Sequence, residues 1–316
     1  MEKGIPILQL FKKTLFWIIR GVLGTLLLFH GGIAFMQEEF LPQEIKVIHL
    51  TRSFAELPEE LSGLKIAFFA DLHWQLGNEK KPLFQDLLRK LRSEAPDLIL
   101  IGGDITDQFL KKVPLQEIEK SLVPFLKELH APMGVFAVMG NHEAACGLQK
   151  YRTLLQAGGL RTLEGEKVFL PAPGNSRAAL ELTGIMEKKW FRPQEKLPEK
   201  WKNEEEKGKF TKIFPLYICH RPEVFDRLFL REKRPFLLLA AHYHGGLFAL
   251  PFLQNGYFVN KRRKRHFAPY IYGNYQKGNG FLTVTSGFSG GYFSSRRRVN
   301  LPRELLIITL QKEGKK

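Results

Sequence analysis

Short apolar runs alternate along the chain with segments in which apolar residues recur at the spacing of a helix. The apolar runs predict strands at residues 64–70, 97–101, 134–139, 179–186, 212–219, 236–241, 281–285 and 305–310. The helical spacing predicts helices at residues 79–94, 115–130 and 147–157. This alternation is typical of α/β proteins, in which helices cover the faces of a sheet. Because strands predominate in the second half, we predict a β-sandwich of two sheets packed face to face and flanked by helices.

The N-terminal region contains an apolar segment of 23 residues, 14–36, which is interrupted by Arg20 and His30. A helix needs about 20 apolar residues to cross a bilayer. The segment therefore fits a single-pass anchor, a helix inserted in one leaflet with Arg20 at the head groups, or a cleaved signal peptide. All three interpretations place the protein at a membrane or beyond it, and we predict an N-terminal hydrophobic helix.

Charges on either side of this segment bear on its orientation. Lys3, Lys12 and Lys13 precede it, whereas Glu38 and Glu39 follow it. By the positive-inside rule, a spanning helix would keep the N-terminus in the cytoplasm and place the folded part outside. A one-leaflet helix would leave the folded part on the cytoplasmic face. We expect a membrane segment and linker over residues 1–45, with linker near 37–60, and one domain over residues 60–316.

Composition and charge narrow the class of protein. Of the 316 residues, 44% are hydrophobic and 25% are charged, as in globular proteins, so wholesale disorder is excluded. The two cysteines form no CxxC motif and cannot make a disulfide framework. The net charge is +16, and two basic clusters, 261–265 and 296–298, stand out near the C-terminus. Such clusters attract anionic lipid head groups or phosphorylated substrates.

One densely charged stretch, residues 187–210, interrupts the strand pattern and contains Trp190, Phe191 and Trp201. Its aromatic side chains would either pack on the core of the domain or face an apolar substrate. In the second case the stretch would be a lid over the site.

Side chains that can bind metal ions follow the apolar runs, at the points where the predicted strands end. Because ligand sites of α/β proteins form where the carboxyl ends of strands converge, we expect these side chains to lie together. The D-x-H and H-x-H pairs would place both side chains on one side of an extended segment. The residues are Asp71, His73, Asp104, Asn141, His142, His220, His242 and His244.

This mixture of imidazole, carboxylate and amide oxygen suits Mn, Fe, Co or Zn better than Ca or Mg. One carboxylate can bind two cations, and Asp104 is our choice for that role. Two ions about 3.5–4 Å apart make a bridging water acidic and hold a phosphate for in-line attack. The sequence therefore predicts a two-metal site for phosphate chemistry.

The D-L-H, G-G-D, G-N-H-E and A-H-Y-H motifs, with His220 between the last two, resemble those of the calcineurin-like metallophosphoesterases in their order. The resemblance runs from about residue 64 to the C-terminus and implies a two-sheet β-sandwich flanked by helices. In place of the usual G-H-x-H, this chain has Ala241 before the first histidine. Asp107 and Glu143 are expected to support the site without being ligands.

The resemblance also implies roles for individual residues. His142 would stabilise or protonate the oxygen of the leaving group. The implied ligands are Asp71, His73, Asp104 and His244 for one metal, and Asp104, Asn141, His220 and His242 for the other.

Within this family, the chain looks most like a membrane-associated branch that includes chlamydial-type UDP-2,3-diacylglucosamine pyrophosphatases of lipid A synthesis. That likeness implies hydrolysis of UDP-2,3-diacylglucosamine to UMP and 2,3-diacylglucosamine 1-phosphate with two divalent ions, Mn²⁺ first among them. It also implies a site at the bacterial inner membrane that faces the cytoplasm, a lipid-linked or nucleotide-sugar substrate, and no nucleic acid partner. A general membrane-associated phosphodiesterase or phospholipid phosphatase is the first alternative. A non-catalytic, basic, membrane-tethered protein that binds polyanions is the second.

Overall fold

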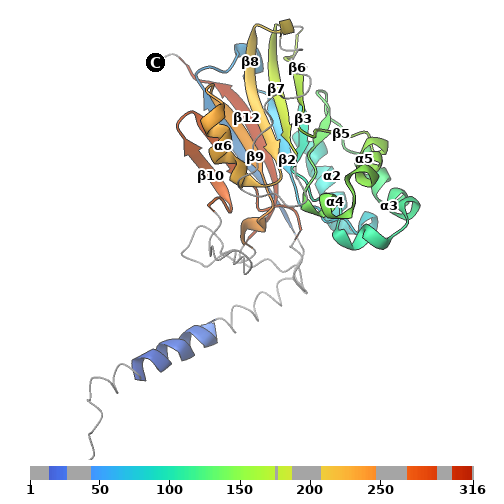
Figure 1. Cartoon of the computed structure of the whole chain (residues 1–316), viewed down its shortest axis with the longest axis vertical. Helices are drawn as coiled ribbons and strands as arrows, with labels where there is room; N and C mark the ends of the chain where they lie inside the picture. The colour runs from blue at the N-terminus through green and yellow to red at the C-terminus, as the bar shows by residue number, and fades with distance from the viewer. Residues whose placement is uncertain are drawn as a thin grey trace, which may run out of the picture.

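The strands of this chain form two six-stranded sheets that pack face to face (Figure 1), as the sequence predicts. The computed structural model describes residues 14–26, 44–174, 177–186, 208–246, 269–289 and 301–314. Helices flank the sandwich, so its predicted α/β architecture is confirmed for the described residues.

The first sheet carries the strands of the N-terminal half together with the last strand of the chain. Strands β2 to β5 run parallel, whereas β12 is antiparallel to β2 and parallel to β1. The carboxyl ends of β2, β3 and β4 therefore lie along the same edge. The order is β1 (Ile45–Phe54), β12 (Arg303–Lys312), β2 (Lys65–Phe69), β3 (Leu98–Ile101), β4 (Val135–Ala137) and β5 (Arg161–Thr162).

The second sheet has a parallel centre and two antiparallel outer strands. Strands β11, β9, β8 and β7 are parallel, and β10 and β6 close the two edges. The carboxyl ends of β8 and β9 are thus neighbours. The order is β10 (Gly273–Lys277), β11 (Gly280–Val284), β9 (Phe236–Ala240), β8 (Lys212–Cys219), β7 (Ala178–Ile185) and β6 (Lys167–Pro171).

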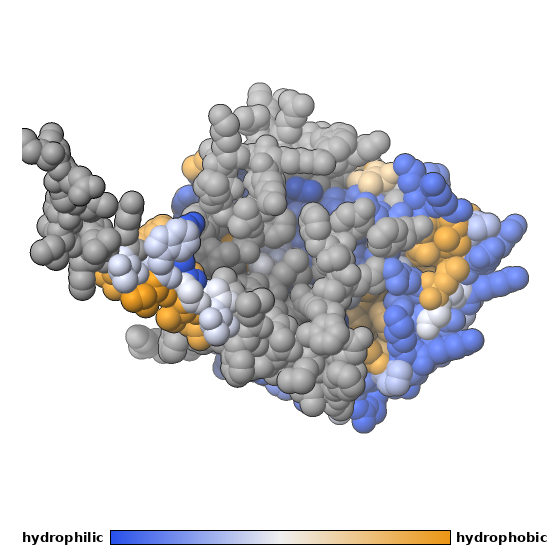
Figure 2. All heavy atoms as spheres, turned by 90° about the horizontal axis from the view of Figure 1, so that it is seen from below, coloured by the Kyte–Doolittle hydropathy of each residue, from blue (hydrophilic) through white to orange (hydrophobic). Residues whose placement is uncertain are grey.

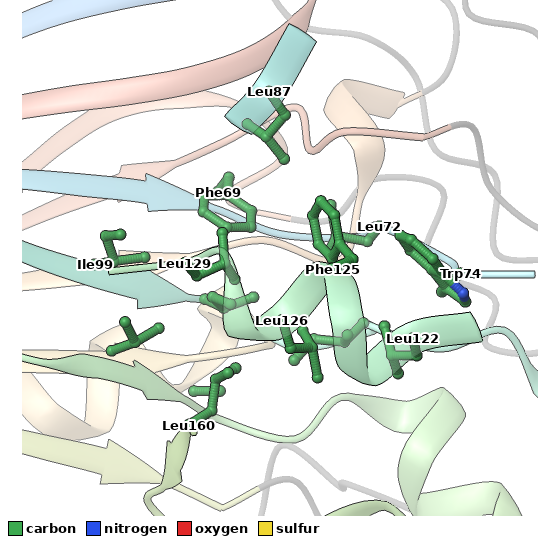
Figure 3. Close-up of a cluster of buried hydrophobic side chains, with 14 of the residues drawn as sticks. Phe69, Leu72, Trp74, Leu87, Ile99, Leu122, Phe125, Leu126, Leu129 and Leu160 are labelled. Atoms are coloured by element: carbon green, nitrogen blue, oxygen red, sulfur yellow. The ribbon is translucent and has the colours of Figure 1, made fainter. Parts of the chain in front are cut away.

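Helices cover the outer faces of both sheets. Three helices pack on the first sheet through their apolar residues: α2 (Pro82–Glu94), α3 (Leu115–Lys127) and α5 (Leu148–Ala157). Figure 3 shows Leu87 of α2 and Leu122, Phe125 and Leu126 of α3 in this layer. Helix α6 (Phe225–Arg231) packs on the second sheet, and a short helix, α4 (Asn141–Cys146), follows β4.

Strand β2 shows how the sequence builds two core layers. Successive side chains of a strand point to opposite faces of the sheet. Ile66 and Phe68 join the apolar layer between the sheets. Ala67 and Phe69 join the layer beneath the helices. Because both faces are buried, the strand is a continuous apolar run, which is why it could be predicted.

The predicted linker over residues 37–60 is wrong for Ile45–Phe54, which form β1. This strand pairs along its full length with β12, from Ile45 opposite Arg303 to Phe54 opposite Lys312. It lies at a sheet edge and alternates buried and exposed positions, so it contains no long apolar run. Its partner strand is more than 250 residues away in the chain, and no local pattern indicates that pairing.

Residues 14–26 are helical, and their large apolar side chains are exposed (Figure 2). Trp17 is 64% exposed and Leu23 is 57% exposed. Among the residues that the structure describes, no helix has the length and apolar character needed to cross a membrane. The remainder of the predicted membrane segment lies outside the described residues, so that segment stays a prediction.

Two other predicted features fall mainly outside the described residues. The described part of the charged stretch begins only at Gly208, so the lid hypothesis is not tested. Both basic clusters, 261–265 and 296–298, also lie outside the described residues.

Replacing Gly184 with alanine is expected to destabilise the fold by about 1–3 kcal/mol. A Cβ atom on Gly184 of β7 would lie 2.2 Å from Leu163 Cβ and 2.6 Å from the Leu163 carbonyl oxygen. Leu163 is fully buried, so the contact can be relieved only by moving backbone. Urea unfolding measures the change. Gly208→Ala is the control, because nothing lies within 4 Å of its added Cβ; equal stability of the two variants would contradict the prediction.

Candidate metal centre

The sequence-predicted site residues gather where the carboxyl ends of five strands meet. Asp71 and His73 follow β2, and Asp104 follows β3. Asn141 and His142 open α4, directly after the β4 segment, while His220 follows β8 and His242 and His244 follow β9. Most of these side chains are buried: Asp71, His73, Asp104, His142, His220 and His244 are each no more than 8% exposed.

The first group contains Asp71, His73 and His244. The Nε2 atoms of His73 and His244 are 3.4 Å apart. Asp71 Oδ1 lies 3.9 Å from the first of these nitrogens and 3.7 Å from the second. Three potential ligand atoms thus surround one point, with the spacing of a group that can hold a metal ion.

The second group contains Asp104, His220 and His242. His220 Nε2 lies 3.1 Å from Asp104 Oδ2 and 3.2 Å from His242 Nδ1. These atoms also lie close enough together to hold an ion. Asp104 Oδ2 is also 4.0 Å from His73 Nε2 of the first group. This carboxylate oxygen therefore lies between the histidines of the two groups.

The backbone at these residues is not extended, which corrects the expectation for the D-x-H and H-x-H pairs. Five site residues have positive φ, and only one other non-glycine residue in the described part, Ala95, shares it. This left-handed conformation costs a non-glycine residue on the order of 1–3 kcal/mol, and such strain is concentrated at functional sites. The chain therefore turns sharply as each strand ends. The angles are 57° at Asp71, 43° at His73, 48° at Asp104, 79° at His242 and 50° at His244.

Hydrogen bonds fix which nitrogen of two histidines carries the proton. His220 Nδ1 lies 2.8 Å from the Gly102 carbonyl oxygen, and His244 Nδ1 lies 3.0 Å from that of Ser289. A carbonyl oxygen only accepts, so Nδ1–H donates in both rings and the neutral ring keeps a lone pair on Nε2. The Nε2 atom of His220 faces Asp104, and that of His244 faces Asp71. A histidine that binds a metal ion through Nε2 needs its lone pair on that atom, with the other N–H held by a hydrogen bond.

His142 has the opposite arrangement. The backbone N–H of Gln108 donates to His142 Nδ1 at 3.1 Å. In the neutral ring the proton is therefore on Nε2, which lies 3.8 Å from Asp104 Oδ2. The side chain presents a donor to the site where the other two histidines present lone pairs.

The protonation states of the groups suit cations. Burial is the main cause that holds the pKa of His73 and of His242 well below the ordinary value, so both rings are neutral at pH 7. Burial alone would raise the pKa of Asp104, but the charges of His220 and His142 outweigh it and hold that pKa well below its usual range. Asp104 is therefore an anion at this site.

Two buried oxygen atoms of the site, Asp71 Oδ1 and Asn141 Oδ1, have no hydrogen-bond partner in the described structure. A buried acceptor without a partner is costly. The histidine lone pairs converge on two points, and these two oxygen atoms lie beside them. Imidazole, carboxylate and amide oxygen are ligands of divalent metal ions, so the arrangement fits a pair of such ions.

Glu143 supports the site in the way that the sequence indicates. Its carboxylate accepts hydrogen bonds from the backbone N–H groups of Asp104, Thr106 and Gly140, at 2.8–3.1 Å. It thereby ties the turn after β3 to the start of α4. Burial, followed by the charge of Asp104, raises the pKa of Glu143. Asp107 is buried with its Oδ1 4.0 Å from His142 Nδ1, consistent with the predicted supporting role.

Ala241, which replaces the glycine of the usual last motif, is not among the residues with positive φ. The extra methyl group therefore adds no backbone strain. The sequence interpretation missed the segment Thr285–Ser289, which contacts Asp71 and His244 through backbone hydrogen bonds. The sequence T-S-G-F-S directly after a predicted strand is the feature that could have indicated this segment.

The metal-free protein is expected to lose stability as the pH falls below about 6.5. The unfolded chain takes up protons on His73 and His242 near that pH, whereas the folded protein, with lowered pKa values, does not. Each histidine contributes a slope of about 1.4 kcal/mol per pH unit while only the unfolded chain is protonated. Urea unfolding of chelator-treated protein at several pH values measures the slope, and added Mn²⁺ should reduce it. A flat profile without metal would contradict the prediction.

Comparison with known proteins agrees with this geometry. The chain is 29% identical over 185 residues to the uncharacterized protein YpbG of Bacillus subtilis strain 168, covering 58% of this chain and 62% of that protein. It is 27% identical over 293 residues to an uncharacterized metallophosphoesterase of Aquifex aeolicus strain VF5, covering 90% and 97%. Over 107 residues it is 35% identical to the UDP-2,3-diacylglucosamine pyrophosphatase LpxG of Chlamydia trachomatis serovar D, covering 32% and 30%.

The family model of the calcineurin-like phosphoesterases matches residues 64–281, which include every residue of the two metal-binding groups. That family and its fold imply a site for two metal ions and hydrolysis of phosphoester bonds. The chain belongs to the calcineurin-like phosphoesterase family.

Proposed function

We propose that this phosphoesterase hydrolyses UDP-2,3-diacylglucosamine to UMP and 2,3-diacylglucosamine 1-phosphate in lipid A synthesis. The observation that carries the choice of substrate is the 107-residue similarity to LpxG, whose name specifies that pyrophosphatase activity. The exposed apolar side chains of residues 14–26 favour a lipid-linked substrate, since such a helix would bring the enzyme to a membrane.

Two divalent ions, Mn²⁺ in our proposal, would supply an acidic water and a double positive charge for the phosphoryl group. Asp104 would bind both ions, because its Oδ2 atom lies between the two groups. The other proposed ligands are Asp71, His73 and His244 for one ion, and Asn141, His220 and His242 for the second.

His142 would act on the leaving group rather than on a metal. Its Nε2–H points into the site, and its Nδ1 accepts from the Gln108 backbone. An N–H held at this position can donate a hydrogen bond to the oxygen of the bond that breaks and stabilise the charge that develops there. His142 is therefore our proposed catalytic residue.

The location of the enzyme follows from the substrate. Nucleotide sugars are found in the cytoplasm, so the proposal requires the domain on the cytoplasmic face of the bacterial inner membrane. Residues 14–26 would then anchor it as a one-leaflet helix. Mapping the C-terminus to the outer side of the membrane would rule out this substrate.

A general membrane-associated phosphodiesterase or phospholipid phosphatase is the second candidate. The match over 97% of the Aquifex aeolicus metallophosphoesterase, whose name gives no substrate, favours it. Both candidates need the same metal residues and differ only in the substrate pocket. Membership of a hydrolase family leaves the non-catalytic polyanion-binding hypothesis unsupported.

Purified protein incubated with Mn²⁺ and UDP-2,3-diacylglucosamine tests the proposal through the release of UMP. An Asn141→Ala variant serves as the control, since it removes one proposed ligand. Release by the wild type alone would support both the chemistry and the substrate. Retained activity on a simple phosphodiester without UMP release would favour the second candidate.

A further inference from the structure

Glu304 is a buried carboxylate near the metal centre that no motif includes. It lies at the start of β12 and is 1% exposed. Its Oε2 atom accepts hydrogen bonds from the backbone N–H of Ser286 at 2.9 Å and from Thr285 Oγ1 at 3.1 Å. Its Oε1 atom accepts from the hydroxyl of Tyr272. A carboxylate so deeply buried is stable only with donors of this kind.

Thr285 and Ser286 belong to the segment Thr285–Ser289, which we call the bracing loop. The backbone of Glu304 also holds this loop, since its N–H donates to the Gly287 carbonyl oxygen at 3.2 Å. Ser286 Oγ donates to the Pro302 carbonyl oxygen at 2.7 Å, which ties the loop again to the start of β12. The loop is therefore attached to β12 by several hydrogen bonds.

The opposite side of the bracing loop contacts the first metal group. The Phe288 and Ser289 backbone N–H groups donate to the carbonyl oxygens of Ala70 and Asp71, at 2.8 and 2.9 Å. The Ser289 carbonyl oxygen accepts from His244 Nδ1 at 3.0 Å. The loop thus holds the backbone of one ligand and the ring orientation of another.

Gly287 brings the loop close to the Asp71 carboxylate. Its φ is 76°, and a Cβ atom at this position would lie 2.5 Å from Asp71 Oδ2. Only glycine adopts this conformation freely and leaves room for that oxygen. The position of the loop therefore determines the space in which the Asp71 carboxylate lies.

We propose that Glu304 is a positioning residue that holds Asp71 and His244 in place through the bracing loop. We expect it to act mainly on the first metal group, because the hydrogen bonds of the loop reach Asp71 and His244. The inference rests on the proposed metal centre and deepens it. Outer partners of metal ligands change metal affinity by about 10- to 100-fold when they are removed.

Replacing Glu304 with leucine tests the proposal by metal binding rather than by activity. Leucine has a similar size but no acceptor atom, so the hydrogen bonds from Thr285 and Ser286 to this side chain are lost. Titration of the metal-free protein with Mn²⁺ is expected to show two tight ions in the wild type. In the variant, one ion should bind as before and the other about 10- to 100-fold more weakly. Electron paramagnetic resonance should correspondingly show coupled ions in the wild type and an isolated Mn²⁺ ion in the variant at limiting metal.

Glu181→Leu is the matched control. Glu181 is also a fully buried carboxylate and accepts from Lys167 and Arg234, but it lies in the middle of β7 and not at the site. It should lower the urea midpoint while both Mn²⁺ affinities stay unchanged. Thr285→Val is a milder second variant should Glu304→Leu not fold, because it removes one hydroxyl that donates to Glu304. It should weaken the same single ion.

The possible results separate the two proposals. If the wild type binds two ions and the Glu304 and Thr285 variants bind both as tightly as the wild type does, the positioning role alone is overturned. Equal weakening of both ions in these variants would also overturn it, since the effect would then be general. A wild type that binds no Mn²⁺ would overturn the metal centre and this inference with it.

Discussion

Replacing Asp104 with asparagine is expected to lower the rate of phosphodiester hydrolysis by about a thousandfold or more. Metal ions stabilise charge in the transition state by several kcal/mol, and each 1.4 kcal/mol is a factor of about ten. Asp104 Oδ2 is the oxygen that lies between the two groups of ligands. An amide cannot bind two cations, and its N–H₂ would also point at the lone pair of His220. Both ions should therefore bind weakly, and the rate should fall with them.

The fold of this variant should survive. Asparagine keeps the Oδ1 acceptor that receives the backbone N–H of His142 at 2.9 Å. Initial rates on a chromogenic phosphodiester and the Mn²⁺ stoichiometry would be measured together. Asp97→Asn is the matched control, because Asp97 precedes β3 at the end opposite to Asp104 and accepts from the Lys65 backbone. Normal rates and metal content in Asp104→Asn would refute its role between the two ions.

The sequence indicates which polar side chains lie close together because the strands that precede them are buried on both faces. Strands β2, β3, β8 and β9 are therefore continuous apolar runs, and the polar residues that follow each run stand out. The parallel arrangement then brings their ends to one edge. Element type, strand order along the chain and the gathering of ligands all follow from this pattern.

The elements that the sequence does not reveal depend on distant contacts. Strand β1 alternates at a sheet edge and is recognisable only beside β12. Strand β5 has two residues, too few for any pattern. The same limit applies to Glu304, since its partners Thr285 and Tyr272 are 19 and 32 residues away and become neighbours only in the folded sheet.

The geometry of the ligands was also beyond the sequence pattern. Alternation suggests that His242 and His244 share one side of an extended segment. In the structure they have φ values of 79° and 50°, and they belong to different metal groups. The hydrogen bonds of Tyr243 and Gly246 close the turn between them. A tight turn therefore places these two histidines in different groups, and spacing alone cannot distinguish this from an extended pair.

Replacing His142 with asparagine should separate stabilisation of the leaving group from metal binding. Loss of one preorganised hydrogen-bond donor costs about 10²- to 10³-fold, so kcat for an alkyl phosphodiester is expected to fall by that factor. With a p-nitrophenyl ester the loss should be much smaller, because that leaving group departs without a proton. The Mn²⁺ stoichiometry should stay at the wild-type value, since the neutral ring directs Nε2–H and not a lone pair into the site.

The dependence on the leaving group is the decisive readout for His142. A residue that merely supports the fold would slow all substrates equally, and a ligand would reduce metal content as Asn141→Ala should. In UDP-2,3-diacylglucosamine the leaving group is a phosphate monoester, whose oxygen is less basic than an alkoxide. The second pKa of a phosphate monoester is about 6, so the loss of rate on this substrate should be as small as that on the p-nitrophenyl ester. An equal loss on all three substrates would contradict an action of His142 on the leaving group, because the hydrogen bond from Gln108 leaves its ring with an N–H to donate only at Nε2.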